Sequence, residues 1–147
     1  MIAVIQRCSQ GKVTVSDKVV GEISHGLVIL LGVQKNDTEN DAEFLVNKIC
    51  GLRIFNDEND KMNLSIKDVN GSALVISQFT LCGDTKKGRR PSFIKAATPD
   101  DGNRLYEYFI SEMKKDGVPI ESGEFGAMMD VELVNNGPVT FVLNSKD

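Results

Sequence analysis

The stretch "GLVILLGV" (residues 26–33) decides the fold, because it is apolar on both faces of the strand that it predicts. A strand that alternates polar and apolar residues covers a core on one side only, whereas a strand that is apolar throughout is buried on both sides. We therefore expect residues 26–33 to form a central strand with other elements packed against each face.

The segments on either side predict further strands and two helices. Residues 1–9, 12–15 and 19–23 are β-rich, and residues 52–55, 72–81 and the segment after 118 read as later strands. A capping-box pattern at Thr38 and a Thr98-Pro99 pair each begin a stretch with helical periodicity. The apolar stripes that we expect to face the sheet are Ala42, Leu45, Val46 and Ile49 in the first helix, and Leu105, Tyr108, Phe109 and Met113 in the second.

These elements predict an α+β fold of mainly antiparallel strands in layered sheets, covered by two helices on one side. At 147 residues and 41% hydrophobic composition, the chain is large enough for one domain with its own core. It has no internal repeat or shift in composition, so we expect residues 1–147 to be a single domain.

Composition excludes several classes of function. Three widely spaced cysteines and one histidine support neither a disulfide framework nor a metal site, so we expect a reduced, cytoplasmic protein without metal or cofactor. No signal peptide or membrane span is indicated. A net charge of −4 argues against a general DNA or RNA coat.

One basic segment departs from this acidic average. Lys86, Lys87, Arg89 and Arg90 crowd the stretch "DTKKGRRPSFIK" (residues 84–95). Such a run is either a solvated loop or a docking point for a small number of phosphates.

The segment before this loop, "SALVISQFTL" (residues 72–81), ends in polar residues within an apolar context. Strand alternation would put Ser77 and Phe79 on one face and Gln78 and Thr80 on the other. Either the strand simply surfaces here, or its end forms the floor of a substrate site in which free backbone N–H groups stabilise an oxyanion.

The stretch "DVELVNNGPVTFVLN" (residues 130–144) reads as two strands with Gly137-Pro138 between them. Proline cannot donate a hydrogen bond to a sheet. The simpler interpretation is a hairpin, because Asn136-Gly137 is a strong two-residue turn signal. The alternative is that the turn itself has a function.

Several of these motifs together resemble the D-aminoacyl-tRNA deacylase family. The resemblance lies in "SQFTL" (residues 77–81), "DTKKGRRPSF" (84–93) and "NNGPVTF" (135–141), with flanking matches in "AVIQR" (3–7), "KMNLSIKDVNG" (61–71) and "SGEFGAMM" (122–129). It spans almost the whole chain in order. Cys82 and Asn136 depart from the family pattern beside the two main motifs, without changing the signature residues.

The resemblance implies an enzyme that hydrolyses the ester between a D-amino acid and the 3′-terminal adenosine of tRNA. It implies a homodimer with active sites at the subunit interface and neither membrane nor DNA as a partner. L-aminoacyl esters would be rejected by a cis Gly137-Pro138 motif that enters the partner's site, whereas glycyl-tRNA, which has no side chain to clash, would be accepted.

The resemblance also assigns roles to individual residues. Ser77, Gln78, Phe79 and Thr80 would form the catalytic strand end, and Lys86, Lys87, Arg89 and Arg90 would meet tRNA phosphates. Phe125, Met129 and Arg7 would lie at the adenosine end of the substrate, with Arg7 bracing the Gly-Pro motif.

The sequence leaves two questions open. For the chemical step, Thr80 would be a nucleophile without an evident base, so we favour backbone oxyanion contacts and a water assisted by the ribose 2′-hydroxyl. For the function, a non-catalytic module that binds the acceptor end of tRNA is the main competitor. A general esterase is less favoured because no catalytic triad is visible.

Overall fold

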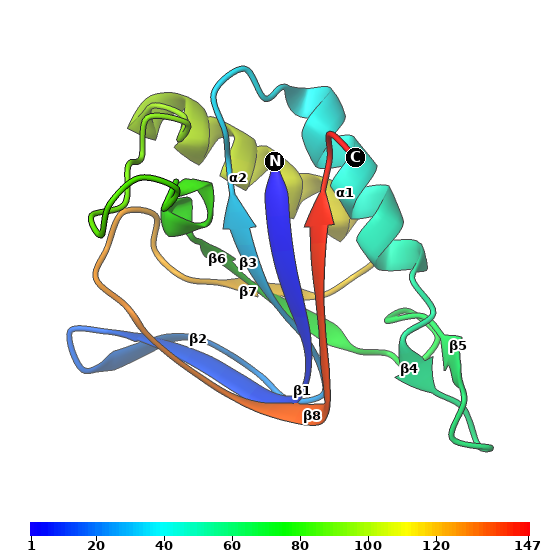
Figure 1. Cartoon of the computed structure of the whole chain (residues 1–147). Helices are drawn as coiled ribbons and strands as arrows, with labels where there is room; N and C mark the ends of the chain where they lie inside the picture. The colour runs from blue at the N-terminus through cyan, green and yellow to red at the C-terminus, as the bar shows by residue number, and fades with distance from the viewer.

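The computed structural model describes residues 1–147 and places the stretch at residues 26–32 in the middle of a curved sheet (Figure 1). In chain order the elements are β1 (Ile2–Val15), β2 (Lys18–Ile23), β3 (Gly26–Gly32), α1 (Glu39–Gly51), β4 (Phe55–Asn56), β5 (Met62–Leu64), β6 (Ser72–Ser77), the 3₁₀ helix η1 (Phe79–Cys82), α2 (Pro99–Lys115), β7 (Ile120–Ser122) and β8 (Asp130–Asn144).

The main sheet has six strands in the order β2-β1-β3-β6-β7, with β8 paired to β1. β2 and β3 follow one another along one edge of β1, and β8 pairs with nearly the full length of the other edge. β3 and β6 are parallel, as are β6 and β7, whereas the pairs that involve β1 are antiparallel. β4 and β5 form a separate two-stranded hairpin.

β3 is buried on both faces, as its composition predicts. Leu27, Ile29 and Leu31 belong to the large core cluster that includes residues of both helices, and Val28 belongs to a smaller cluster on the other face of the sheet. The helices α1 and α2 lie side by side on one side of the sheet (Figure 1). The predicted α+β class with two helices on one side is confirmed.

Both helices begin at the predicted caps. Thr38 and Asp41 form a capping box at the start of α1, and the Thr98 hydroxyl accepts a hydrogen bond from the N–H of Asp101 at the start of α2. The first buried stripe is as expected, but in α2 it is Tyr106 that is fully buried, and Tyr108 is only half-buried. Neither helix is long and apolar enough to span a membrane.

Three strand predictions need correction. The strand predicted over residues 72–81 ends at Ser77, because β3, its pairing partner, ends at Gly32 and leaves no ladder to continue. The strand predicted at residues 52–55 is limited to Phe55–Asn56. Residues 130–144 form one strand rather than a hairpin, since β1, at 14 residues, is long enough to pair with both halves.

Candidate active site

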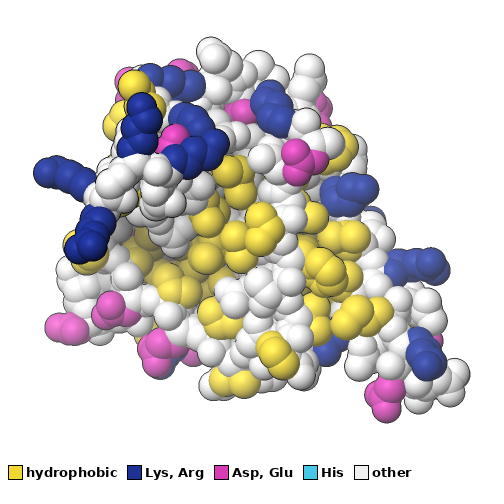
Figure 2. Space-filling view, in the orientation of Figure 1, with side chains coloured by type: hydrophobic (Ala, Val, Ile, Leu, Met, Phe, Trp, Pro, Cys, Tyr) yellow, Lys and Arg dark blue, Asp and Glu magenta, His cyan; other side chains and the backbone are white.

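A cleft of about 510 Å³ opens where β6 ends, beside the start of α2. Its walls come from residues 77–79, from residues 96–99 with Gly102, and from residues 125–129 with Val131. Phe125 and Met129, which the resemblance assigns to the adenosine end of the substrate, line it. Most of the lining is hydrophobic, which is typical of a site that holds an apolar or aromatic group (Figure 2).

None of the 16 residues that line the cleft carries an ionisable side chain. The sole histidine, His25, packs edge-on against Phe55 with 5.3 Å between ring centroids and does not line the cleft. No group of histidine, cysteine or acidic side chains is arranged to hold a metal ion. The side chains that line this cleft therefore include no general acid or base.

The end of β6 supplies main-chain groups instead. The first hydrogen bond of η1 runs from the N–H of Leu81 to the carbonyl of Gln78, at 3.2 Å. The N–H groups of Phe79 and Thr80, at the start of the helix, have no acceptor within it. Phe79 lines the cleft and Thr80 follows it directly, so these N–H groups belong to the turn of chain beside the cleft.

The Thr80 side chain is exposed, and its hydroxyl contacts the side-chain amide of Gln78. Gln78 cannot act as a base, because an amide does not take up a proton near neutral pH. Phe79 is also exposed, with 57% of its surface open to solvent. Since η1 replaces the last residues of the predicted strand, Ser77 to Thr80 do not alternate between two sheet faces.

η1 is held tightly against the end of β3. The N–H of Gln78 donates to the carbonyl of Leu31 at 2.8 Å, and the Cys82 thiol donates to the carbonyl of Val33 at 3.5 Å. A Cβ atom on Gly32 would lie 3.1 Å from the Gln78 carbonyl oxygen, so glycine permits this approach. Burial raises the pKa of the Cys82 thiol, which keeps it protonated as a donor.

Tyr106 supports two walls of the cleft from behind. Its hydroxyl donates to the carbonyl of Val75 in β6 at 2.8 Å, and its ring lies 5.9 Å from the ring of Phe125. Burial raises the pKa of Tyr106 to about 12, so the hydroxyl stays neutral. The sequence did not single out this residue, because Tyr106 and Tyr108 both fit a helical stripe and only the packing distinguishes them.

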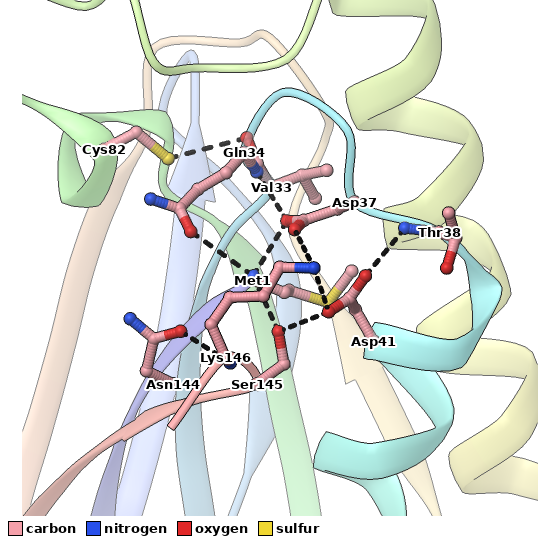
Figure 3. A network of polar contacts seen from close by, with 10 residues as sticks. All are labelled: Met1, Val33, Gln34, Asp37, Thr38, Asp41, Cys82, Asn144, Ser145 and Lys146. Carbon is pink, nitrogen blue, oxygen red and sulfur yellow. Dashed lines mark hydrogen bonds and ion pairs between the residues drawn. The ribbon is translucent and has the colours of Figure 1, made fainter.

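A buried polar network supports the third wall (Figure 3). The α-amino group of Met1 pairs with Asp37 at 2.8 Å, and both are fully buried. Asp37 also accepts a hydrogen bond at 2.7 Å from the N–H of Gln34, in the loop between β3 and α1. This loop bonds to residues 95–97 through Lys35 N–H to Lys95 carbonyl at 2.9 Å and Ala97 N–H to Val33 carbonyl at 3.0 Å. No local pattern in the sequence singles out Asp37.

The basic loop stands beside the cleft rather than in it. Asp84 and Ser92 exchange two main-chain hydrogen bonds, at 2.7 and 2.9 Å, which close the base of the loop. Phe93 packs edge-on against Phe79, with 5.0 Å between ring centroids, and connects the loop to the mouth of the cleft. Lysine and arginine side chains gather over this side of the molecule (Figure 2). The four predicted cations, all exposed and none in an ion pair, are Lys86, Lys87, Arg89 and Arg90.

Gly137 and Pro138 lie in a bulge of β8, away from their own chain's cleft. Gln6 pairs with Thr140 and Cys8 pairs with Asn135, so residues 136–139 interrupt the pairing opposite the single residue Arg7. The Gly137-Pro138 peptide is cis, and both residues are exposed. Gly137 has a φ of +147°, a conformation that favours glycine.

Two side chains hold this turn. The Asn135 amide oxygen accepts from the N–H of Val139 at 2.7 Å across the turn. The Arg7 guanidinium donates through Nε to the carbonyl of Asn136 at 2.8 Å. Arg7 thus contacts the turn and does not line the cleft of its own chain, where Phe125 and Met129 lie.

Known proteins match this chain over almost its whole length. A family model described as D-Tyr-tRNA(Tyr) deacylase matches residues 4–144. A D-aminoacyl-tRNA deacylase of Thermotoga petrophila is 55% identical over 145 residues, which are 99% of this chain and 97% of the relative. One of Bacillus cytotoxicus is 55% identical over 146 residues, 99% of this chain and 100% of the relative. A solved structure of the c-Myc DNA Unwinding Element Binding Protein, 37% identical, superposes with a TM-score of 0.93 and covers 98% of both chains.

Proposed function

The chain belongs to the D-Tyr-tRNA(Tyr) deacylase family, and from this membership we infer that it hydrolyses the ester of D-aminoacyl-tRNA, releasing the D-amino acid and the tRNA. The observation that carries this conclusion is the 55% identity to D-aminoacyl-tRNA deacylases over 99% of the chain. The activity is that of a hydrolase, and it removes D-amino acids before they enter translation.

The composition of the cleft supports catalysis by the main chain. An aminoacyl ester is already activated, so a positioned water and a stabilised oxyanion suffice for its hydrolysis. In this proposal the N–H groups of Phe79 and Thr80 bind the oxyanion, and the 2′-hydroxyl of the substrate's terminal ribose assists the attacking water. Ser77 and Gln78 shape the strand end that carries these groups.

The apolar cleft suits the terminal adenosine. Phe125 and Met129 offer flat and polarisable surfaces to a base, and Tyr106 keeps the Phe125 ring in place. The contact between Phe93 and Phe79 connects the basic loop to the mouth of the cleft, and in this proposal the four unpaired cations of the loop meet the phosphates that precede the terminal adenosine. The proposed partner is therefore aminoacyl-tRNA, bound by its 3′ end.

Chiral selectivity requires a second copy of the chain in this proposal. Gly137 and Pro138 are exposed and do not line their own cleft, so they are free to enter the cleft of a partner. β8 also exposes Val142, at 71% of its surface, on the sheet face that it shares with its paired residue Val4 and, through Val4, with Leu30. Such a face is typical of a homodimer interface.

Selectivity in this arrangement comes from exclusion. Gly137 has no Cβ, so the turn can approach the substrate's Cα closely, and main-chain oxygens then stand where an L side chain would project. A D side chain points away toward solvent and needs no dedicated pocket. Glycine has no side chain to exclude, so we expect activity on glycyl-tRNA as well.

The experiment that tests this function compares hydrolysis of D-tyrosyl-tRNA and L-tyrosyl-tRNA by the purified protein and by Pro138→Ala. We expect rapid release from the D-ester alone by the natural protein, and a smaller D-to-L ratio for the variant. If neither ester is hydrolysed while tRNA still binds, the chain is a binding module for the tRNA acceptor end and the enzymatic assignment is wrong.

A further inference from the structure

The guanidinium of Arg7 is a buried cation with unusual partners. Only 6% of the residue is exposed, yet Arg7 takes part in none of the chain's ion pairs. Its three acceptors are neutral oxygens: the carbonyls of Asn136 and Ile54, at 2.8 and 2.9 Å, and the side-chain oxygen of Asn56, at 3.0 Å. A buried charge without hydrogen-bond partners costs more free energy than a buried neutral group does. Loss of any one of the three hydrogen bonds should therefore be costly.

These acceptors lie on two different elements. Nε of Arg7 binds the turn in β8, whereas Nη1 binds Asn56 in β4 and the carbonyl of Ile54, the residue just before β4. Nη2 lies within 3.2 Å of the position that a Cβ on Gly137 would occupy, so the guanidinium is in close contact with the turn. The guanidinium is therefore one of the two side-chain groups that hold the turn, the other being the Asn135 amide.

β4 is a firm anchor for the guanidinium. Ile54 and Phe55 belong to the large core cluster, with 5% and 1% of their surfaces exposed, and the Phe55 ring also packs against His25. Asn56 follows directly and is exposed, so its side chain is free to reach Arg7 from a rigid base. It is the one acceptor of the three that comes from a side chain.

We propose that Asn56 is a positioning residue for chiral selection. Together with the Ile54 carbonyl it fixes the conformation of Arg7, and Arg7 in turn fixes where Gly137 and Pro138 stand. Arginine has a long flexible side chain, so removal of one of the two bonds on the β4 side lets the guanidinium and the turn move together. Small displacements of a positioning group have large effects, and exclusion of an L side chain depends on the exact place of the turn.

This inference rests on the proposed function, because it assigns Asn56 to the turn that rejects L-esters. It predicts a specific pattern: loss of Asn56 raises hydrolysis of L-aminoacyl-tRNA more than it lowers hydrolysis of D-aminoacyl-tRNA. A residue that only stabilised the fold would lower both rates and leave their ratio unchanged.

Three variants test it. Asn56→Ala removes the acceptor, Asn56→Asp retains an acceptor oxygen for Arg7, and Asn63→Ala is the matched control. Asn63 lies in the same hairpin, and its amide binds Asp57 at 2.9 Å without contact to Arg7. For each, kcat/KM is measured on D-tyrosyl-tRNA and L-tyrosyl-tRNA, and the thermal midpoint is measured alongside.

We expect Asn56→Ala to lower the D-to-L ratio about tenfold, the effect of losing one hydrogen bond to a charged group, while Asn56→Asp and Asn63→Ala stay within about twofold of the natural protein. An unchanged ratio in Asn56→Ala, or an equal loss in Asn63→Ala, would overturn the assignment. If the natural protein does not hydrolyse the D-ester, the proposed function itself is wrong. If it hydrolyses the D-ester selectively and Asn56→Ala leaves the D-to-L ratio unchanged, only the role of Asn56 is wrong.

Discussion

At the scale of single residues, the proposed mechanism relies on main-chain atoms more than on side chains. Phe79 and Thr80 present N–H groups, and Gly137 has no side chain to obstruct the close approach of the turn to a substrate. Side chains such as Tyr106 and Arg7 hold this main chain in place. We therefore expect a substitution to change activity when it displaces the main chain, whatever the polarity of the side chain that it removes.

Thr80 distinguishes the two accounts of catalysis. Its hydroxyl contacts only the amide of Gln78, which cannot accept a proton, so we expect Thr80→Ala to retain kcat within about threefold of the natural protein. Single-turnover hydrolysis of D-tyrosyl-tRNA checks this. Loss of kcat by a factor of about 100 or more with unchanged tRNA binding would identify Thr80 as a nucleophile instead.

Residues differ in how far the sequence predicts them. Phe125 and Met129 were expected in the cleft because a motif carries them, and they line it. Tyr106 and Asp37 were not, because their importance comes from buried partners that are distant in the sequence, such as Val75 for Tyr106 and the amino group of Met1 for Asp37. The fold brings such partners together from positions far apart in the sequence, and a local sequence pattern does not predict such contacts.

At the scale of elements, pairing partners override local signals. Residues 78–81 remain apolar enough for a strand, but β3 ends at Gly32 and the chain turns into η1. Asn136-Gly137 is a hairpin signal, yet β1 pairs with residues on both sides of it. The starts of both helices were predicted correctly, because N-cap residues and a 3.6-residue period are local properties.

The basic loop is an element whose contribution can be measured through salt. Replacing Lys86, Lys87, Arg89 and Arg90 by Gln should raise KM for aminoacyl-tRNA about tenfold or more, and should flatten the dependence of KM on salt concentration, because fewer counterions are released on binding. KM is measured between 50 and 200 mM salt.

A matched control removes the same number of positive charges from positions outside the basic loop, so that its net charge equals that of the loop variant. Lys18, Lys48, Lys61 and Lys114 are exposed lysines outside the basic loop. If their replacement by Gln raises KM equally, the loop has no special role and only the overall charge matters.

The start of α1 should give the fold a dependence on acid pH. Burial alone would raise the pKa of Asp41, but hydrogen bonds from Lys146, the N–H of Thr38 and Ser145 outweigh it and hold this pKa below its ordinary value. A carboxyl with a lowered pKa in the folded state stabilises the fold above about pH 4, and this contribution is lost as the pH falls through the folded value.

We therefore expect Asp41→Asn to lower the free energy of unfolding by about 1 to 2 kcal/mol at pH 7, and to differ less from the natural protein at pH 3. Urea unfolding at the two pH values measures this. Asp100→Asn, which alters an exposed first-turn carboxylate of α2 outside any ion pair, should change little at either pH. A difference for Asp41→Asn that persists unchanged at pH 3 would contradict the electrostatic origin.

At the scale of the whole molecule, one chain contains a cleft and a turn that do not meet. The cleft lies at the end of β6, whereas Gly137 and Pro138 project from β8 next to β1. The family resemblance, and not the pattern of strands, suggested that two copies bring them together. A second copy is the simplest way to cover the apolar face of β8 and to complete the site in one step.

Val142 tests this arrangement, because it is 71% exposed on β8 and a charge there leaves the fold intact while disfavouring an apolar interface. We expect sedimentation to give twice the chain mass of 16.1 kDa for the natural protein and the single chain mass for Val142→Asp. The variant should then lose D-selectivity, because no partner turn reaches its cleft. Val19→Asp, also on an exposed strand position at 51%, should remain dimeric and selective. If the natural protein sediments as a monomer and still rejects L-esters, the turn must act within its own chain. The turn and the cleft are separated in this fold, so β8 would then have to rearrange.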